Sequence, residues 1–350
     1  MSAASESQPA PSALVGRAFI KPGFDFLVIG GGLSLVVLAV VLGVRHQVGG
    51  RVPQNLTLPL LLLCTSTHFA ASTVRLYSKP GSFRTLPMMT MAFPAISIAV
   101  ALAALQWPEL AGRHLFQLYL SWSPYHYAAQ TFGLASMYTA RGGVMLTPGE
   151  RRLLHLTCML PFAHSFVYAS GAGLGWLLPP SFYVAHPALL PVREALIWAT
   201  GVATFAVPVA LLALLRRRKA RALPHIVPCL LVSNGVWWVV LPYQQAFFWA
   251  TIFHGLQYLA IVIVFHLKDH PPTGGGAYAW VKPSLKFYGA CLALAYLLFE
   301  VWPYFFTWLG FSFSESVLVC VAVINLHHFI VDRGIWQIRK DPGNQQAVAT

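Results

Sequence analysis

Charged residues are scarce in this sequence. Of its 350 residues, 9% are Asp, Glu, Lys or Arg, and only 10 are acidic, whereas 57% are hydrophobic. A soluble domain usually has about 25% charged residues. A soluble globule of this size could not cover its surface with so few charges, and a disordered chain would be far less apolar. We therefore expect a polytopic membrane protein.

Common functional motifs are missing as well. The sequence has no CxxC pair, no Walker loop, no GxGxxG between a strand and a helix, and no repeat of 20–50 residues. The net charge of +13 does not indicate a nucleic-acid partner, because most basic residues fall in short gaps between apolar runs. The five cysteines all lie inside apolar runs, where they are expected to be small core residues rather than thiolate ligands.

Hydropathy predicts an all-α integral membrane protein with about ten transmembrane helices, since ten apolar stretches each come close to the ~20 residues that a spanning helix needs. The stretches are 24–44, 57–77, 86–106, 112–139, 152–171, 194–215, 225–241, 246–267, 285–306 and 313–336. Residues 1–20 are rich in Ser, Ala and Pro and are expected to form a disordered cytoplasmic tail. Residues 21–340 would form a single transmembrane domain, and residues 341–350 a second cytoplasmic tail.

The basic residues predict how the chain is oriented in the membrane. They cluster after every even-numbered stretch, and the opposite gaps hold at most two each. The clusters are Arg75, Lys79 and Arg84; Arg141, Arg151 and Arg152; Arg216, Arg217, Arg218, Lys219 and Arg221; Lys268, Lys282 and Lys286; and Arg333, Arg339 and Lys340. Basic residues favour the cytoplasmic side, so both termini are expected there. A bacterial inner membrane is the expected location, with membrane lipids as the surroundings.

Histidine is the residue that stands out, because its 13 copies outnumber Asp and Glu together. Four predicted helices, all running from outside to inside, carry histidines at or below mid-helix. These are His68, His126, His254, and the adjacent His327 and His328. Polar residues inside a membrane are costly and usually face protein or a cavity. Imidazoles at matched depth on four parallel helices therefore predict a shared site in the cytoplasmic half.

Each of these histidines has a polar neighbour three or four residues away, on its own helical face. The neighbours are Ser72, Gln130, Gln257, Tyr258 and Asp332. Metal-bound histidines typically give their second ring nitrogen to such a partner, so the pattern predicts a metal site. The expected ligands are His68, His126, His254, His327, His328, Gln130 and Gln257, with His164 of the fifth stretch as a further candidate. Tyr258 and Asp332 are the expected catalytic residues.

The leading hypothesis is a membrane metalloenzyme in which one or two iron ions activate dioxygen to oxidise a lipid or another apolar substrate, with electrons from a donor. Copper or haem are alternative cofactors. The composition and the cytoplasmic-side histidines resemble those of the histidine-box membrane desaturases and hydroxylases. The patterns HxxxQ at His126 and HHxxxD at His327 differ from that family's HxxxH and HxxHH boxes. The resemblance therefore implies iron and oxygen chemistry, but no individual residue role.

Two other classes of protein stay open. A haem- or quinone-linked electron-transfer protein needs axial histidines on facing helices. Two stacked haems need two ligands on one face of each helix, whereas His114 and His126, like His254 and His266, are twelve residues apart and about 120° off a shared face, so a single haem is the form that stays open. A transporter ranks third. Proton-coupled carriers usually use a carboxylate at mid-membrane, but no acidic residue lies at mid-depth in the predicted helices, and no inverted repeat is visible.

Overall fold

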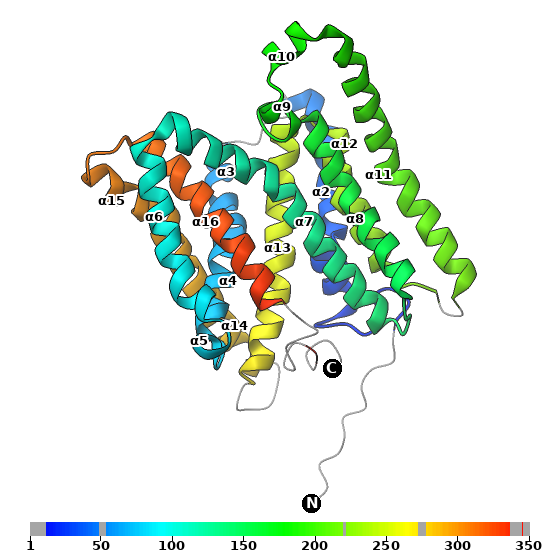
Figure 1. Cartoon of the computed structure of the whole chain (residues 1–350). Helices are drawn as coiled ribbons and strands as arrows, with labels where there is room; N and C mark the ends of the chain where they lie inside the picture. The colour runs from blue at the N-terminus through cyan, green and yellow to red at the C-terminus, as the bar shows by residue number, and fades with distance from the viewer. Residues whose placement is uncertain (1–11, 49–53, 220–221, 272–277, 337–344, 346–350) are drawn as a thin grey trace, which may run out of the picture.

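The computed structural model describes residues 12–48, 54–219, 222–271, 278–336 and 345, and within them every regular element is a helix (Figure 1). Each of the ten predicted stretches is mostly helical, and the first is interrupted at Gly30 and Gly31. The elements that build the bundle are α1 (Pro22–Phe24), η1 (Asp25–Ile29), α2 (Gly32–Val48), α3 (Gln54–Leu60), η2 (Leu61–Ser66), α4 (Thr67–Ser78), η3 (Met88–Ala92), α6 (Phe93–Gln106), α7 (Arg113–Arg141), α8 (Pro148–Tyr168), α11 (Leu190–Arg218), α12 (Ile226–Val240), α13 (Tyr243–Asp269), α14 (Tyr278–Tyr296), η6 (Leu297–Val301), α15 (Trp302–Trp308) and α16 (Phe313–Ile335).

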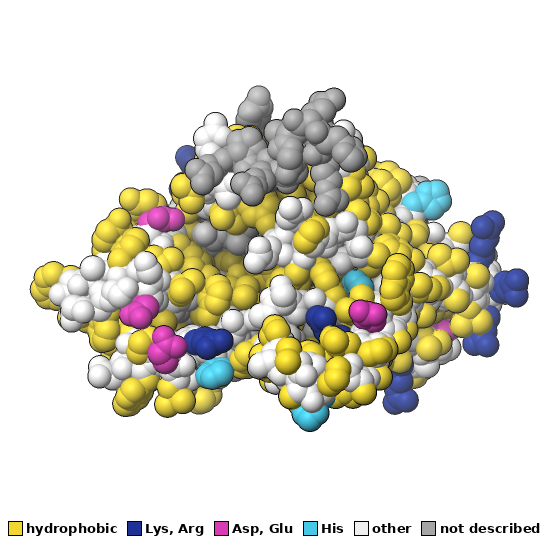
Figure 2. All heavy atoms as spheres, turned by 90° about the horizontal axis from the view of Figure 1, so that it is seen from above, with side chains coloured by type: hydrophobic (Ala, Val, Ile, Leu, Met, Phe, Trp, Pro, Cys, Tyr) yellow, Lys and Arg dark blue, Asp and Glu magenta, His cyan; other side chains and the backbone are white. Residues whose placement is uncertain are grey.

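Among the described residues, six helices are long and apolar enough to cross a membrane. A seventh span is added if Pro22–Ile29 and Gly32–Gly43, which meet at a bend of 53°, are one broken helix. Large apolar side chains stay exposed on the outer helices, including Leu58 (71%), Trp198 (76%) and Val209 (66%). Hydrophobic side chains also far outnumber charged ones on the face seen in Figure 2. These features support an all-α, multi-pass membrane protein.

Helix α13 forms the centre of the bundle (Figure 1). It packs against α4, α7, α12 and α14, and α16 packs against α4, α6 and α7. Among the candidate spans α13 has the largest buried share, whereas α6, α11 and α14 are mostly exposed. The helices that carry the polar residues are therefore inside the bundle, and the uniformly apolar helices are outside, as hydrocarbon surroundings require.

The expected disorder of residues 1–20 is wrong for residues 12–20. Val15 is fully buried, and the backbone N–H groups of His225 and Ile226 donate to the carbonyls of Ala13 and Leu14, at 3.1 and 2.9 Å. This segment packs under the ends of α7 and α12 because its apolar side chains join the core there. The rest of the predicted N-terminal tail, residues 1–11, and the predicted tail 341–350, except residue 345, lie outside the described residues.

A buried carboxylate fixes the start of the first helix. Asp25 is fully buried and accepts hydrogen bonds from the backbone N–H groups of Phe19 (2.6 Å) and Ile20 (3.1 Å) and from the hydroxyl of Tyr138 (2.8 Å). A buried charge is tolerated only when hydrogen bonds replace its hydration. Asp25 therefore joins the N-terminal segment to α7.

An ion pair joins α8 and α11. The Lys219 ammonium lies 2.6 Å from the Glu150 carboxylate, in the capping box that begins α8. The pair holds the pKa of the Glu150 carboxyl below its usual range, mainly through the Lys219 hydrogen bond. It links the end of α11 to the start of α8.

Candidate metal centre

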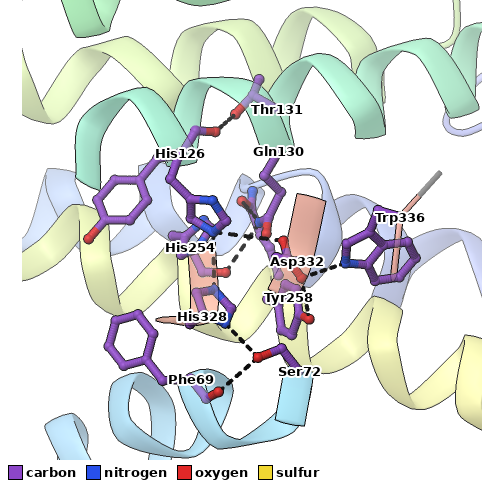
Figure 3. A network of polar contacts seen from close by, with 12 residues as sticks. Phe69, Ser72, His126, Gln130, Thr131, His254, Tyr258, His328, Asp332 and Trp336 are labelled. Carbon is purple, nitrogen blue, oxygen red and sulfur yellow. Dashed lines mark hydrogen bonds and ion pairs between the residues drawn. The ribbon is translucent and has the colours of Figure 1, made fainter. Parts of the chain in front are cut away.

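Four imidazoles from four different helices converge inside the bundle, and Figure 3 shows those of His126, His254 and His328. They belong to His68 of α4, His126 of α7, His254 of α13 and His328 of α16. Ring centroids are 4.9 Å apart for His68–His254, His126–His254 and His126–His328, and 5.0 Å apart for His68–His328. Each ring is thus next to two of the others, and the four residues are here called the four-histidine cluster. No member is more than 8% exposed. The convergence expected from their matched depth is observed.

A serine on a neighbouring helix sets the tautomer of His328. The hydroxyl of Ser72 donates to the carbonyl of Phe69 at 3.0 Å, so its oxygen accepts from His328 Nδ1 at 2.9 Å. A neutral His328 ring with its hydrogen on Nδ1 has a free lone pair on Nε2. This is the arrangement in which a histidine serves as a metal ligand through Nε2.

The free nitrogen of His328 points at His126. Their Nε2 atoms are 3.1 Å apart. Two nitrogens bound to one tetrahedral ion at about 2.0–2.1 Å would be about 3.3 Å apart, so this separation fits two ligands of one metal. It also fits a hydrogen bond from one neutral imidazole to the other when no ion is present.

The other two imidazoles have no such partner. Both ring nitrogens of His254 are buried without a hydrogen bond to any described residue, and the only described hydrogen-bond partners near the His68 ring are the backbone carbonyls of Cys64 and Thr65 on its own helix. An unsatisfied buried polar group costs about 1–3 kcal/mol, and native structures contain few of them. Each neutral imidazole has one N–H and one lone pair. The lone pairs of His68 and His254, side by side and without a donor among the described residues, indicate that a bound species completes their coordination.

A carboxylate lies at the edge of the cluster (Figure 3). Asp332 Oδ1 accepts hydrogen bonds from the Tyr258 hydroxyl at 2.5 Å and from the Trp336 indole N–H at 2.7 Å. Asp332 Oδ2 lies 3.9 Å from His126 Nε2. One oxygen is therefore held by two donors, and the other faces the imidazoles. Tyr258 itself lies between two of the rings, 5.7 Å from His68 and 5.4 Å from His328 by ring centroids.

Two overlapping groups of ligand atoms are compact enough to hold an ion. His68, His254 and His328 form one group, and His126, His328 and Asp332 form the other, with all ligand atoms in each group within 4.8 Å of one another. His328 belongs to both. The donors are imidazole nitrogen and carboxylate oxygen, and all five free cysteines are buried and belong to neither group. This donor set suits iron, zinc, copper or manganese.

The remaining predicted ligands are not brought into these groups. His327 lies on another face of α16, and its Nε2 has no hydrogen-bond partner among the described residues. His164 faces α11, where its Nδ1 lies 3.1 Å from the Thr200 hydroxyl and its ring stacks on Tyr168. Successive residues on a helix are about 100° apart, which explains why only one of His327 and His328 reaches the cluster.

The two predicted glutamines lie next to His254. Gln130 Nε2 donates to the carbonyl of His254 at 3.3 Å and to Gln257 Oε1 at 3.5 Å. The pair joins α7 to α13 behind the cluster. The two amides thus form hydrogen bonds with the backbone of α13 and with each other. Gln130 Oε1 is buried and has no hydrogen-bond partner among the described residues.

Arg75, which the sequence groups with the basic residues at the end of the second stretch, lies inside the protein. The side chain is fully buried, pairs with Asp269 at 3.4 Å and lies over the rings of Trp336 and Phe265 at 4.4 and 5.2 Å. It is inside the protein because α4 and α13 are neighbours, and its charge is offset by a carboxylate that lies 194 positions away in sequence.

Several residues of the site were not predicted. Ser72 was expected to pair with His68 on its own helix, but it binds His328 of α16. Trp336, one turn after Asp332, could have been found from the i, i+4 rule. Aromatic walls complete the site, since the ring of Tyr127 lies 4.3 Å from His254 and that of Phe329 stacks on His126 at 4.5 Å. Nothing in the sequence distinguishes Tyr127 and Phe329 from aromatic residues that only pack in an apolar core.

Comparisons with models of known protein families, with curated proteins and with solved structures found no match to this chain.

Proposed function

We propose that this chain is a multi-pass membrane metalloprotein whose four-histidine cluster, with Asp332, binds a metal ion for oxidation chemistry. The observation that carries the proposal is the pair of imidazoles of His68 and His254, whose lone pairs have no donor among the described residues, beside the 3.1 Å pair of His126 and His328. One bound cation would take the lone pair of each ring, and the second nitrogen of each ring would keep its hydrogen.

A single ion fits better than a pair of ions. His328 is the residue that both ligand groups share, but its Nδ1 donates to Ser72, so it has one lone pair to offer. It therefore serves one ion and cannot bridge two. A haem is also less favoured, because axial ligands approach a macrocycle from opposite sides, whereas these four rings surround one point at centroid spacings of 4.9–5.0 Å.

Iron is the proposed ion, and the proposed reaction is a metal-dependent oxidation of a lipid or other apolar molecule with electrons from a donor. Iron held by imidazoles and one carboxylate would supply one-electron chemistry with dioxygen. The chain's own contribution is to exclude water with Tyr127, Phe69 and Phe329, and to hold a proton between Tyr258 and Asp332 at their 2.5 Å hydrogen bond.

The test of the metal proposal is the element content of the detergent-purified protein. We expect about one iron per chain after expression with added iron, since the four-histidine cluster offers one set of ligands. A strong chelator should remove it and lower the melting temperature, because an ion that binds only the folded state stabilises that state. Protein that is monodisperse and contains no transition metal after growth with iron, zinc, copper or manganese would overturn the proposal.

We also propose that all ten predicted helices cross a bacterial inner membrane and that both termini are cytoplasmic. The alternation of basic gaps supports this orientation. The two ends of the described chain also meet at one end of α13, since the rings of Phe19 and Trp336 both pack on Phe265. Lys268 lies over Phe19 at the same end.

The orientation has its own test. Reporters fused after residue 350 and within the 172–192 loop should be found on opposite sides of the membrane, because five spans would separate these points. A cytoplasmic reporter at both positions would contradict the ten-helix topology, although it would leave the metal proposal intact.

A further inference from the structure

The first membrane helix is broken beside Ser233 of α12 and Gln257 of α13, the latter one turn from His254. Segments Pro22–Ile29 and Gly32–Gly43 meet at 53°, and Gly31 between them has a φ of +82°. A Cβ atom at Gly31 would lie 2.2 Å from Ser233 Oγ and 3.3 Å from Gln257 Nε2, so only glycine fits. Non-helical backbone at membrane depth is tolerated where it is covered by protein or lines a cavity.

A small, partly open cavity lies beside this break. Its volume is about 30 Å³, and it is bounded by α2, α7, α12 and α13. Six polar residues line it: Ser34, Thr131, Ser233, Asn234, His254 and Gln257. A volume of this size holds one or two water molecules and no organic substrate. His254 is therefore the point at which the cavity reaches the four-histidine cluster.

The hydrogen bonds around the cavity leave acceptors facing it. The hydroxyls of Ser233 and Thr131 donate to backbone carbonyls of their own helices, at 3.2 and 3.0 Å. Ser34 Oγ accepts from the Trp237 indole N–H at 2.7 Å. Hydroxyl oxygens whose hydrogens are already used retain lone pairs. Together with the one lone pair of the neutral His254 ring, which is 4% exposed, they match a ligand that donates hydrogen bonds.

We propose that this cavity is a water site, and that through it a neutral ligand of one or two heavy atoms reaches the ion held by the four-histidine cluster. The inference rests on the proposed metal centre and adds the direction of approach. Small ligands arrive past the helix break, on the His254 side. Asp332 and Tyr258 mark a different side of the cluster, next to His126 and His328. An organic substrate would have to arrive by another route.

The test fills the cavity without touching a ligand. Ala250 of α13 lines it, so Ala250→Leu places three additional carbon atoms there. The matched control is Ala199→Leu, the same change at an exposed position of α11. Each protein is loaded with Fe(II) without oxygen and mixed with nitric oxide, a diatomic probe whose complex with ferrous iron has a distinct electron paramagnetic resonance signal.

We expect the three proteins to bind equal iron, and nitric oxide to bind to the Ala250→Leu protein at least about tenfold more slowly than to the wild type and the Ala199→Leu protein, because access then requires a rearrangement. Equal rates in all three proteins would overturn the inference while leaving the metal centre in place. If the wild-type protein binds no iron, the proposed function fails instead.

A second measurement tests the cavity without any metal. In a high-resolution map of the metal-free protein, ordered water should lie within hydrogen-bond distance of Ser233 or Gln257 and of His254, because a polar cavity of this size is expected to be hydrated. The Ala250→Leu protein should lack that water. A dry cavity in the wild-type protein would overturn the inference even if the leucine variant fails to fold.

Discussion

His328→Ala is expected to leave the protein without bound metal. His328 belongs to both compact groups of ligand atoms, and its Nε2, freed by the hydrogen bond from Nδ1 to Ser72, lies 3.1 Å from His126 Nε2. Removing it takes one ligand from a site that has no spare imidazole within reach. Loss of a ligand changes the coordination of the ion, so we expect metal content below about a tenth of the wild-type value.

The neighbouring histidine provides a matched control. His327→Ala removes the same side chain from the adjacent position of α16, but His327 belongs to neither ligand group. Its metal content should equal that of the wild type. Both variants are measured by elemental analysis on protein that elutes as a single species, because membrane helices associate through many distributed contacts and should survive either change. Full metal in His328→Ala, or equal loss in both variants, would contradict the proposed centre.

Asp332→Asn should give a weaker but still occupied site. The aspartate presents one oxygen to two donors and the other to the cluster, 3.9 Å from His126 Nε2. An asparagine that keeps its oxygen toward Tyr258 and Trp336 must turn its NH2 group toward the imidazoles, and the negative charge beside the cation is lost. Changes of this kind typically cost about 10–100-fold in metal affinity or activity.

The control for Asp332→Asn is a neutralised acid on the same helix. Glu315→Gln, in the first turn of α16, makes the same change in charge at the far end of the helix and should leave metal affinity unchanged. Tyr258→Phe should have an effect between the two, since Asp332 keeps its charge and loses one of two hydrogen-bond donors. Competition with a chelator of known affinity measures all three. If Asp332→Asn and Glu315→Gln bind metal equally well, Asp332 has no part in the site.

The sequence by itself predicted the helices and the four imidazoles that meet. Long apolar runs specify helices wherever hydrocarbon surrounds the chain, because only internal hydrogen bonds satisfy the backbone there. His68, His126, His254 and the adjacent His327 and His328 could be selected as candidates because buried polar residues are costly in that medium, so histidines at one depth on four helices indicate a shared site.

Only the tertiary structure decided which faces of the helices meet. Helical periodicity predicts which residues share a face of one helix, but it contains no information on how that helix is rotated against its neighbours. Packing between helices paired Ser72 with His328, Arg75 with Asp269, and His164 with Thr200. The same packing placed His328 in the cluster and left His327 outside it, and it ordered residues 12–20 against α7 and α12. These pairings depend on contacts between segments that are distant in sequence, and a single helix's pattern cannot specify them.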